Sequence, residues 1–180
     1  MALYRNGVFV DGDDWVFPEP GEPVPADRPA ALRRDAWLAL RDTLAGRGAP
    51  VGLALEPGEA LDSVLPDLQH IALIALRLPK FNDGRAYSTA RALRDAHGYR
   101  GELRARGDVL QDQIKLLLRA GFDALEIVHA PTIAALRAGR VVAVARHYQP
   151  GAPDVDERGG EAYSWRRTSS PIGSAPGRSS

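Results

Sequence analysis

Two arginines separated by one residue are the strongest chemical signal in this sequence. Arg104 and Arg106 alternate with Leu103 and Ala105 in the segment ELRARG, and such alternation is typical of a β-strand. Because side chains two residues apart in a strand point to the same side, both guanidinium groups are expected to project together. Guanidinium groups offer paired hydrogen-bond donors to carboxylate, phosphate or sulfur oxyanions. The pair therefore predicts a binding site for a small oxyanion.

Further polar side chains follow the ends of predicted strands and are expected at the same rim. In parallel sheets, ligands bind outside the carboxyl ends of the strands. Tyr87, with Arg91 one turn later on a predicted helix, could orient a substrate or cofactor, or simply pack its ring and hydrogen-bond at the rim. The candidate ligand-binding residues are Lys80, Asn82, Asp83, Arg85, Tyr87, Arg91, Arg104, Arg106, Asp108 and Gln111.

The arginine pair also has a structural interpretation. Arg104 and Arg106 could instead form ion pairs with Glu102, Glu126 or Asp108 on a solvated rim, where such pairs contribute little. The sequence leaves both interpretations open.

His129 is the candidate for proton transfer, because an unperturbed imidazole titrates near physiological pH. It follows a short predicted strand and precedes Pro131, a position where a histidine can also cap or pack. His70, His97 and His147 are not close to it in sequence, so no metal site is expected. The chain has no cysteine and therefore no thiolate ligand or thiol nucleophile of its own.

The charge distribution narrows the class of partner. The segment 77–119 contains ten Lys and Arg against five Asp and Glu, a local net charge of +5, although the whole chain is neutral. This asymmetry favours a small anion or an acidic partner, whereas overall neutrality and few interleaved aromatic residues argue against nucleic acid. The motifs GxGxxG, GxxxxGK[ST], HExxH and GxSxG are absent, so the sequence identifies no cofactor.

The elements that position these residues are predicted to alternate between strand and helix. Predicted strands cover 51–55, 70–78, 102–106 and 124–128, followed by an extended segment at 141–148. Predicted helices begin at Pro29, at about Gly58 with an end before Pro66, at Asp83 and Gly84, after a capping box from Asp108 to Gln111, and at Pro131 or Thr132.

This alternation predicts an α/β fold, in which a parallel sheet is built from βα units with helices on the sheet faces. Either an open sheet or part of a (βα) barrel fits the pattern. Asp83 and Asp108 are expected to satisfy backbone donors at their own helix starts, which weakens a phosphate site at either position.

The two ends of the chain differ from its centre. A hairpin is expected from 8–10 and 15–17 around Asp11, Gly12 and Asp13, followed by a proline-rich arm to about Asp27. After Pro150 the composition turns to Gly, Pro, Ser and Arg, which is typical of disorder. The expected organisation is an arm at 1–28, an α/β domain at 29–149 and a disordered tail at 150–180.

The sequence also predicts a location. The start MALYRNGVFVDGDDW lacks the features of a secretory signal, and the longest apolar stretch, 71–76, is too short to span a bilayer. A cytoplasmic protein with no membrane partner is expected.

The segments FNDGRAYSTARALR, GYRGELRARGDVLQDQ and RAGFDA closely resemble a bacterial domain family of unknown function, DUF934, over about Leu68 to Ile127. Members are often described as oxidoreductases associated with sulfite reduction. The resemblance implies a role in sulfur assimilation and cysteine biosynthesis, with sulfite reductase or related sulfate-assimilation proteins as partners. The motif positions singled out by it are Asp83, Gly84, Arg85, Tyr87, Ser88, Arg91, Glu102, Arg104, Gly107, Asp108, Gln111 and Gln113.

Two hypotheses follow, from different functional classes. The first is an oxidoreductase or other sulfur-assimilation enzyme that binds a small oxyanion or a cofactor at the strand ends. The second is a noncatalytic partner that docks on the sulfite-reducing machinery through its basic face, in which case its affinity should fall steeply with salt.

Overall fold

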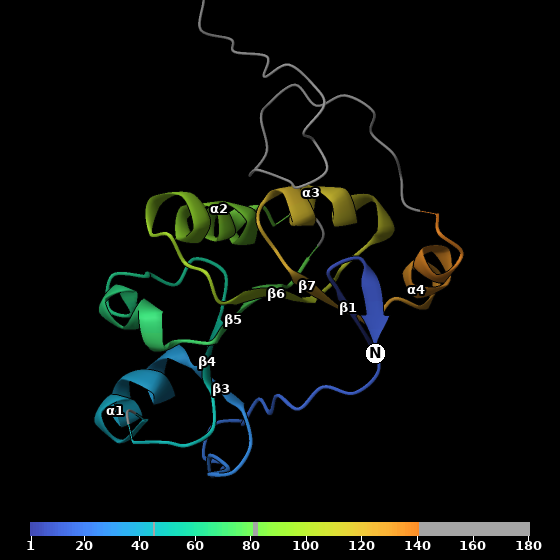
Figure 1. The fold of residues 1–180 in the computed structure, drawn as a ribbon. Helices are drawn as coiled ribbons and strands as arrows, with labels where there is room; N and C mark the ends of the chain where they lie inside the picture. Colours follow the sequence, from blue (N-terminus) through green and yellow to red (C-terminus); the bar gives the residue numbers. More distant parts are fainter. Residues whose placement is uncertain (45, 81–82, 141–180) are drawn as a thin grey trace, which may run out of the picture.

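Seven strands form one mostly parallel sheet in the computed structural model, which describes residues 1–44, 46–80 and 83–140. The strand order is β2-β1-β7-β6-β5-β4-β3 (Figure 1). The predicted α/β class is confirmed. The strands are β1 (Ala2–Arg5), β2 (Val8–Val10), β3 (Ala30–Arg33), β4 (Val51–Leu55), β5 (Leu73–Leu78), β6 (Glu102–Gly107) and β7 (Ala124–Ile127).

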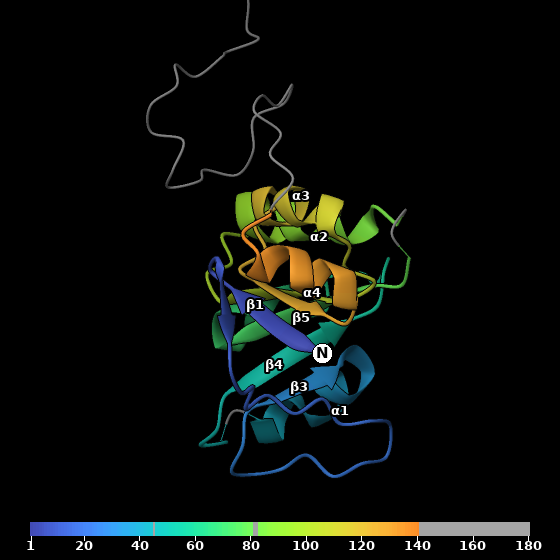
Figure 2. The same cartoon turned by 90° about the vertical axis from the view of Figure 1, so that its right-hand side faces the viewer.

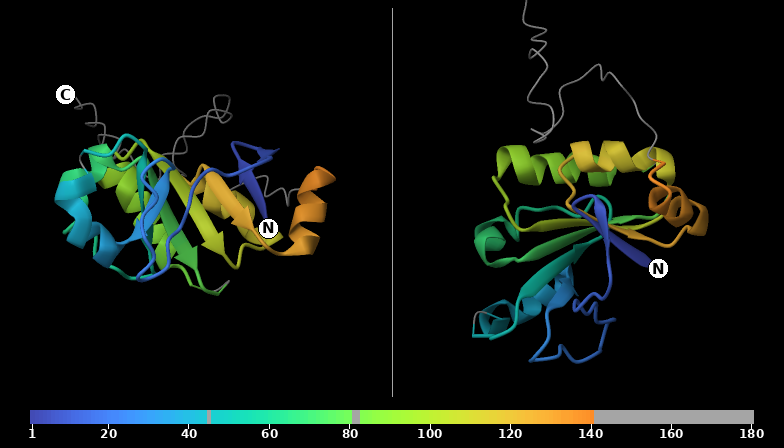
Figure 3. Two further views of the ribbon diagram at one scale, coloured as in Figure 1. Left: turned by 90° about the horizontal axis from the view of Figure 1, so that it is seen from below. Right: turned by 45° about the vertical axis from the view of Figure 1, so that its right-hand side comes forward.

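Helical segments connect the parallel strands β3 to β7, which are neighbours in chain order. The carboxyl ends of these strands therefore lie along one edge of the sheet, as the arrowheads in Figure 3 show. The helical segments are α1 (Arg34–Leu44), the 3₁₀ turn η1 (Leu65–His70), α2 (Arg85–Arg91) with its π-helical continuation η2 (Ala92–Ala96), the 3₁₀ turn η3 (Gln111–Gln113), α3 (Ile114–Arg119) and α4 (Ala130–Arg137).

The main hydrophobic core lies between one face of the sheet and the helices. Side chains such as Leu53, Ile74 and Leu103 point into it and meet Trp37 of α1 and Leu117 of α3. Because strands joined in chain order by crossovers of one hand place every connection on the same side, the helices cover one face only. The helices that the sequence places on the sheet faces are therefore found on one of the two faces.

After β2, the N-terminal arm crosses the opposite, concave face of the sheet (Figures 1 and 2). Trp15 and Phe17 pack there against Ala31, Leu73 and Ala75 in a second, small apolar cluster. The sheet is shaped to receive them, since a Cβ at Gly52 would lie 2.8 Å from the Trp15 ring.

The hairpin at the N-terminus differs from the prediction. It joins β1 to β2 through Asn6 and Gly7, whose φ angles of 48° and 86° suit the two-residue turn between antiparallel strands. Residues 15–17 form no hairpin with 8–10; only Val16 makes a bridge, to Ala30. β1 pairs antiparallel with β7, which extends the sheet.

Three further boundaries also differ. The chain from Pro29 first forms β3, whose Ala30, Ala31 and Leu32 are at most 1% exposed, and only then α1. Pro66 lies in the first turn of η1 rather than ending a helix, because proline at that position costs no hydrogen bond. β5 begins at Leu73, three residues later than expected.

The predicted capping box from Asp108 to Gln111 is wrong by two residues. Leu110 donates its backbone N–H to the Gln113 side-chain oxygen at 2.9 Å, so the helical segment begins at Gln111. The strands predicted at 51–55, 102–106 and 124–128 and the helix after Pro131 are confirmed within one or two residues. The extended segment and tail predicted after residue 140 lie outside the described residues.

Replacement of Gly107 tests whether the close approach between the ends of β6 and β5 requires a glycine. Its φ of 113° is unfavourable for other residues, and a Cβ there would overlap the Leu78 carbonyl oxygen. Gly107→Ala should lower the free energy of unfolding, measured by urea denaturation, by about 1–3 kcal/mol or more. Gly48→Ala is the control, since it has open space and is expected to be nearly neutral. Equal unfolding midpoints for the two variants would contradict this account of β6.

Candidate functional site

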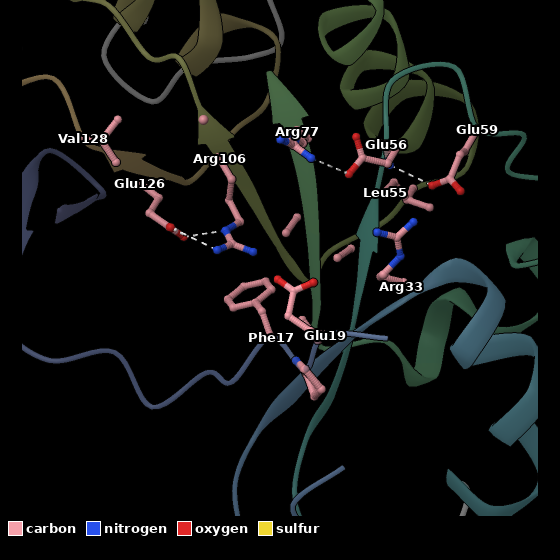
Figure 4. Close-up of a pocket in the computed structure, with 15 residues that line it drawn as sticks. Phe17, Glu19, Arg33, Leu55, Glu56, Glu59, Arg77, Arg106, Glu126 and Val128 are labelled. Atoms are coloured by element: carbon pink, nitrogen blue, oxygen red, sulfur yellow. Dashed lines mark hydrogen bonds and ion pairs between the residues drawn. The ribbon is translucent and has the colours of Figure 1, made fainter. Parts of the chain in front are cut away.

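A cleft of about 340 Å³ opens on the concave face near the carboxyl ends of the parallel strands. Ala31, Ala54 and Ala75 line it as small residues, which leaves room above the sheet. Charged side chains from several strands and from the arm point into the cleft, as Figure 4 shows. These charged residues are Arg33, Arg77, Arg106, Glu19, Glu56, Glu59 and Glu126.

Alternation along the strands explains this charged lining. Arg77, Arg106 and Glu126 are in register across β5, β6 and β7, so their side chains form one row on the concave face. Arg33 lies at the end of β3, opposite Ala54 of β4 in the neighbouring row. Basic groups from three strands therefore reach one cleft.

Arg106 is the most firmly held of these groups. Its Nε and Nη2 donate to the Glu126 carboxylate at 2.7 and 3.2 Å, and Glu126 is only 6% exposed. The Arg106 guanidinium also lies over the Phe17 ring, 3.5 Å from the ring centroid. The third nitrogen points toward the open cleft in Figure 4. Arg106 thus presents its Nη1 amino group in a fixed orientation.

Arg77 and Arg33 are held more loosely. Arg77 donates to Glu56 at 3.1 Å, with 59% and 42% of the two side chains exposed. Among the carboxylates that the structure describes, Arg33 forms an ion pair with Asp35 alone, at 3.9 Å and on the surface. Because exposed pairs of this kind contribute at most about 1 kcal/mol, a ligand could replace either carboxylate at small cost.

Arg104 has a structural role. It is fully buried, its guanidinium binds both oxygens of the Asp13 carboxylate, and its Nε donates to Glu102 at 2.8 Å. Glu102 is also paired with Arg5. Burial alone would lower the pKa of Arg104, but hydrogen bonds and charge from Asp13 and Glu102 raise it above its usual value. Arg104 is therefore a charged anchor for the arm and does not line the cleft.

The structure places Arg104 and Arg106 on the same face, as their alternation predicts, with Arg106 in the cleft. Arg106 is paired with Glu126 and Arg104 with Glu102, as expected if the arginines form internal ion pairs. Arg104 is also paired with Asp13, which the sequence did not predict.

The other predicted site residues do not line the cleft. Lys80 is exposed, and Asn82 lies outside the described residues. Arg85 pairs with Asp83 at the start of α2, and Arg91 pairs with Asp95 along the same helical segment.

Three further candidates sit around α3 and its preceding loop. Tyr87 hydrogen-bonds to Gln113, and burial raises its pKa. The Asp108 backbone N–H donates to the Leu78 carbonyl oxygen at 2.9 Å. Gln111 donates to the Arg140 carbonyl oxygen at 2.7 Å.

His129 precedes α4, with its Nδ1 2.8 Å from the Thr132 hydroxyl. Its neighbour Val128 lines the cleft, but His129 does not. No group of three His, Cys, Asp or Glu side chains within the described residues could hold a metal ion.

Sequence reasoning missed Arg33, Arg77, Glu56 and Phe17 as lining residues. Arg77 could have been found from the alternation of Leu73, Ala75 and Arg77 along β5. Glu56 could have been found because it directly follows the strand predicted at 51–55. Arg33 and Phe17 had no local signal. β3 reads as helix in the sequence, and Phe17 reaches the cleft only through the path of the arm.

Comparison with known protein families assigns the larger part of the chain to one family. The family model described as a bacterial protein of unknown function (DUF934) matches residues 52–157, more than half of the chain. The chain belongs to the DUF934 family. No curated protein matches its sequence. The matched range contains Arg77, Arg106 and Glu126, whereas the arm and Arg33, which complete the cleft, precede it. In the part of the chain that the structure describes, no helix is long and apolar enough to cross a membrane.

Asp13→Asn tests the anchor between arm and sheet. The change keeps the side-chain shape but leaves buried Arg104 with Glu102 as its one charged partner in the described part of the chain. Breaking a buried ion pair costs about 3–5 kcal/mol, and the remaining partner should keep the loss near 3 kcal/mol in urea denaturation. Asp14→Asn, at the exposed neighbouring position, should change stability by less than about 0.5 kcal/mol. Similar losses in both variants would show that Arg104 does not depend on Asp13.

Asp83→Asn tests the start of α2. Side-chain and backbone hydrogen bonds from Arg85 lower the pKa of Asp83 from 3.8 to about 2. A lowered pKa in the folded state means that ionised Asp83 stabilises the fold above about pH 4 and that this effect disappears as the pH falls toward 2. The melting temperature of wild type should exceed that of the variant at neutral pH, and the two should converge in acid. A difference that does not change with pH would contradict the assignment.

Proposed function

We propose that this member of the DUF934 family takes part in assimilatory sulfite reduction in the cytoplasm and binds a small oxyanion in its concave cleft. The observation that carries the proposal is the convergence of Arg33, Arg77 and Arg106 on that cleft. Guanidinium groups match the oxygens of sulfite and sulfate in both charge and donor geometry.

The three arginines offer different kinds of contact. Arg106 is oriented by Glu126 and Phe17, so it can supply a donor without losing further side-chain freedom. Arg77 can exchange the exposed Glu56 carboxylate for an oxyanion, and Arg33 can approach from β3. An oxyanion would thus replace weak internal contacts with charge-assisted hydrogen bonds.

The link to sulfur chemistry comes from the family resemblance, which implies association with sulfite reductase and cysteine biosynthesis. The cleft itself is lined by arginines, glutamates, one aromatic ring and small residues, which bind and orient charge. We therefore propose an accessory role in which electrons are supplied by the partner machinery.

Docking through a basic face is less well supported by the arrangement of charge. At least six of the ten basic residues in 77–119 are paired with carboxylates within the described residues. Most of the positive charge predicted to attract a partner is therefore neutralised by the chain itself.

Anion binding can be tested by thermal denaturation in sulfite, sulfate and chloride at equal ionic strength. Sulfite or sulfate should raise the melting temperature more than chloride. Arg77→Gln should weaken binding about tenfold or more, because a hydrogen bond to a charged group contributes roughly 1.5–3 kcal/mol. Arg91→Gln, which removes a paired and partly exposed arginine outside the cleft, is the matched control and should bind as wild type does.

Two outcomes would overturn the proposal. One is the absence of any stabilisation by sulfite or sulfate beyond that of chloride. The other is salt-sensitive binding of a sulfite reductase subunit that Arg77→Gln leaves unchanged, which would favour the docking hypothesis.

A further inference from the structure

The cleft contains more acidic than basic groups, although its arginines suggest an anion site. Three arginines and four glutamates line it, so the lining carries a formal charge of −1. A free dianion such as sulfate would meet this negative charge without any cation of its own. The glutamates therefore offer contacts that an oxyanion alone would not use.

Two of the four carboxylates are already engaged in fixed contacts. Glu126 is buried and binds Arg106 through both oxygens. Glu59 accepts the backbone N–H of Glu56 at 2.7 Å and so shapes the loop after β4. These two groups belong to the framework of the cleft.

The other two carboxylates are placed to contact a ligand. Glu56 becomes free when an oxyanion takes its place on Arg77. Glu19 comes from the arm, and Figure 4 shows its carboxylate pointing into the cleft beside Phe17. No cation within the described residues pairs with Glu19, although its backbone N–H donates to Glu22 at 2.9 Å. Occupation by an oxyanion thus leaves two unbalanced carboxylates facing the same space.

We infer that the oxyanion in this cleft is one end of a small zwitterion whose ammonium group binds Glu19 and Glu56. This inference rests on the proposed anion site and adds the class of ligand. Arg77, Arg106 and Arg33 hold the oxyanion, and the two glutamates hold the ammonium. A short aliphatic link packs beside Phe17 and over Ala54, and a volume of about 340 Å³ suits a molecule of amino-acid size.

Taurine and ethanesulfonate form a matched pair of probes, because they share the sulfonate and differ in the ammonium group. Binding is measured by isothermal titration calorimetry on the full chain at constant pH and ionic strength. Taurine should bind about tenfold more tightly than ethanesulfonate, as expected for a charge-assisted hydrogen bond.

Variants separate the two ends of the ligand. Glu19→Gln should remove most of the advantage of taurine and leave ethanesulfonate binding unchanged or slightly stronger. Arg77→Gln should weaken both probes. Asp27→Asn, which removes an exposed carboxylate from the same arm outside the cleft, is the control and should alter neither.

The outcomes distinguish this inference from the proposed function. Equal affinities of taurine and ethanesulfonate for the wild-type chain would overturn the zwitterion and leave the anion site intact. An advantage of taurine that persists in Glu19→Gln would also overturn it, since the ammonium would not lie where we place it. Failure of both sulfonates and of sulfite to bind would instead reject the anion site itself.

Discussion

The buried ion pair between Arg104 and Asp13 is the constraint on which the rest of the concave face depends. A guanidinium with no solvent exposure is stable only if carboxylates and hydrogen bonds replace its water, and Asp13 and Glu102 do so. Glu102 comes from the same strand, whereas Asp13 comes from the arm, 91 residues away in sequence. Burial of Arg104 thus requires the arm to cross this face, where a helix would otherwise be needed to cover Leu73 and Ala75.

The position of the arm in turn determines what the cleft contains. Once Asp13 is attached to Arg104, Trp15 fits against Gly52 and Phe17 lies over the Arg106 guanidinium. A few residues later the same segment brings the Glu19 carboxylate to the cleft. The lining residues that the arm and the strands contribute to the cleft are therefore coupled through the buried contact between Asp13 and Arg104. Loss of that contact would alter the cleft even though neither Asp13 nor Arg104 lines it.

The pattern of apolar and polar residues predicted most strands of the sheet. It did not predict that the position of the arm, and with it the cleft, depends on the contact between Asp13 and Arg104. Strands β4 to β7 are short apolar or alternating segments, and the alternation within β6 correctly placed Arg104 and Arg106 on one face. β3 was missed because its sequence AALR also suits a helix, and pairing with β4 decides between the two. The helix start after β6 was displaced because Gln113, rather than Gln111, accepts the capping hydrogen bond from the backbone. Phe17 and Glu19 could not be assigned to the site, since their positions depend on a contact between residues distant in sequence.

Ion pairs between distant parts of the sequence also explain how a basic segment can occur in a chain with no net charge. The basic segment 77–119 draws several of its carboxylate partners from outside itself, including Asp13, Glu56, Asp123 and Glu126. The excess of positive charge in 77–119 is therefore balanced by carboxylates from other parts of the chain. Removing a buried partner leaves a charge without solvation, so the inner pairs are fixed, whereas the exposed pairs at the mouth of the cleft can be exchanged at small cost. Exchange of partners is consequently confined to the loosely held Arg77 and Arg33, while Arg106 and Arg104 keep their carboxylates and maintain the surface of the cleft.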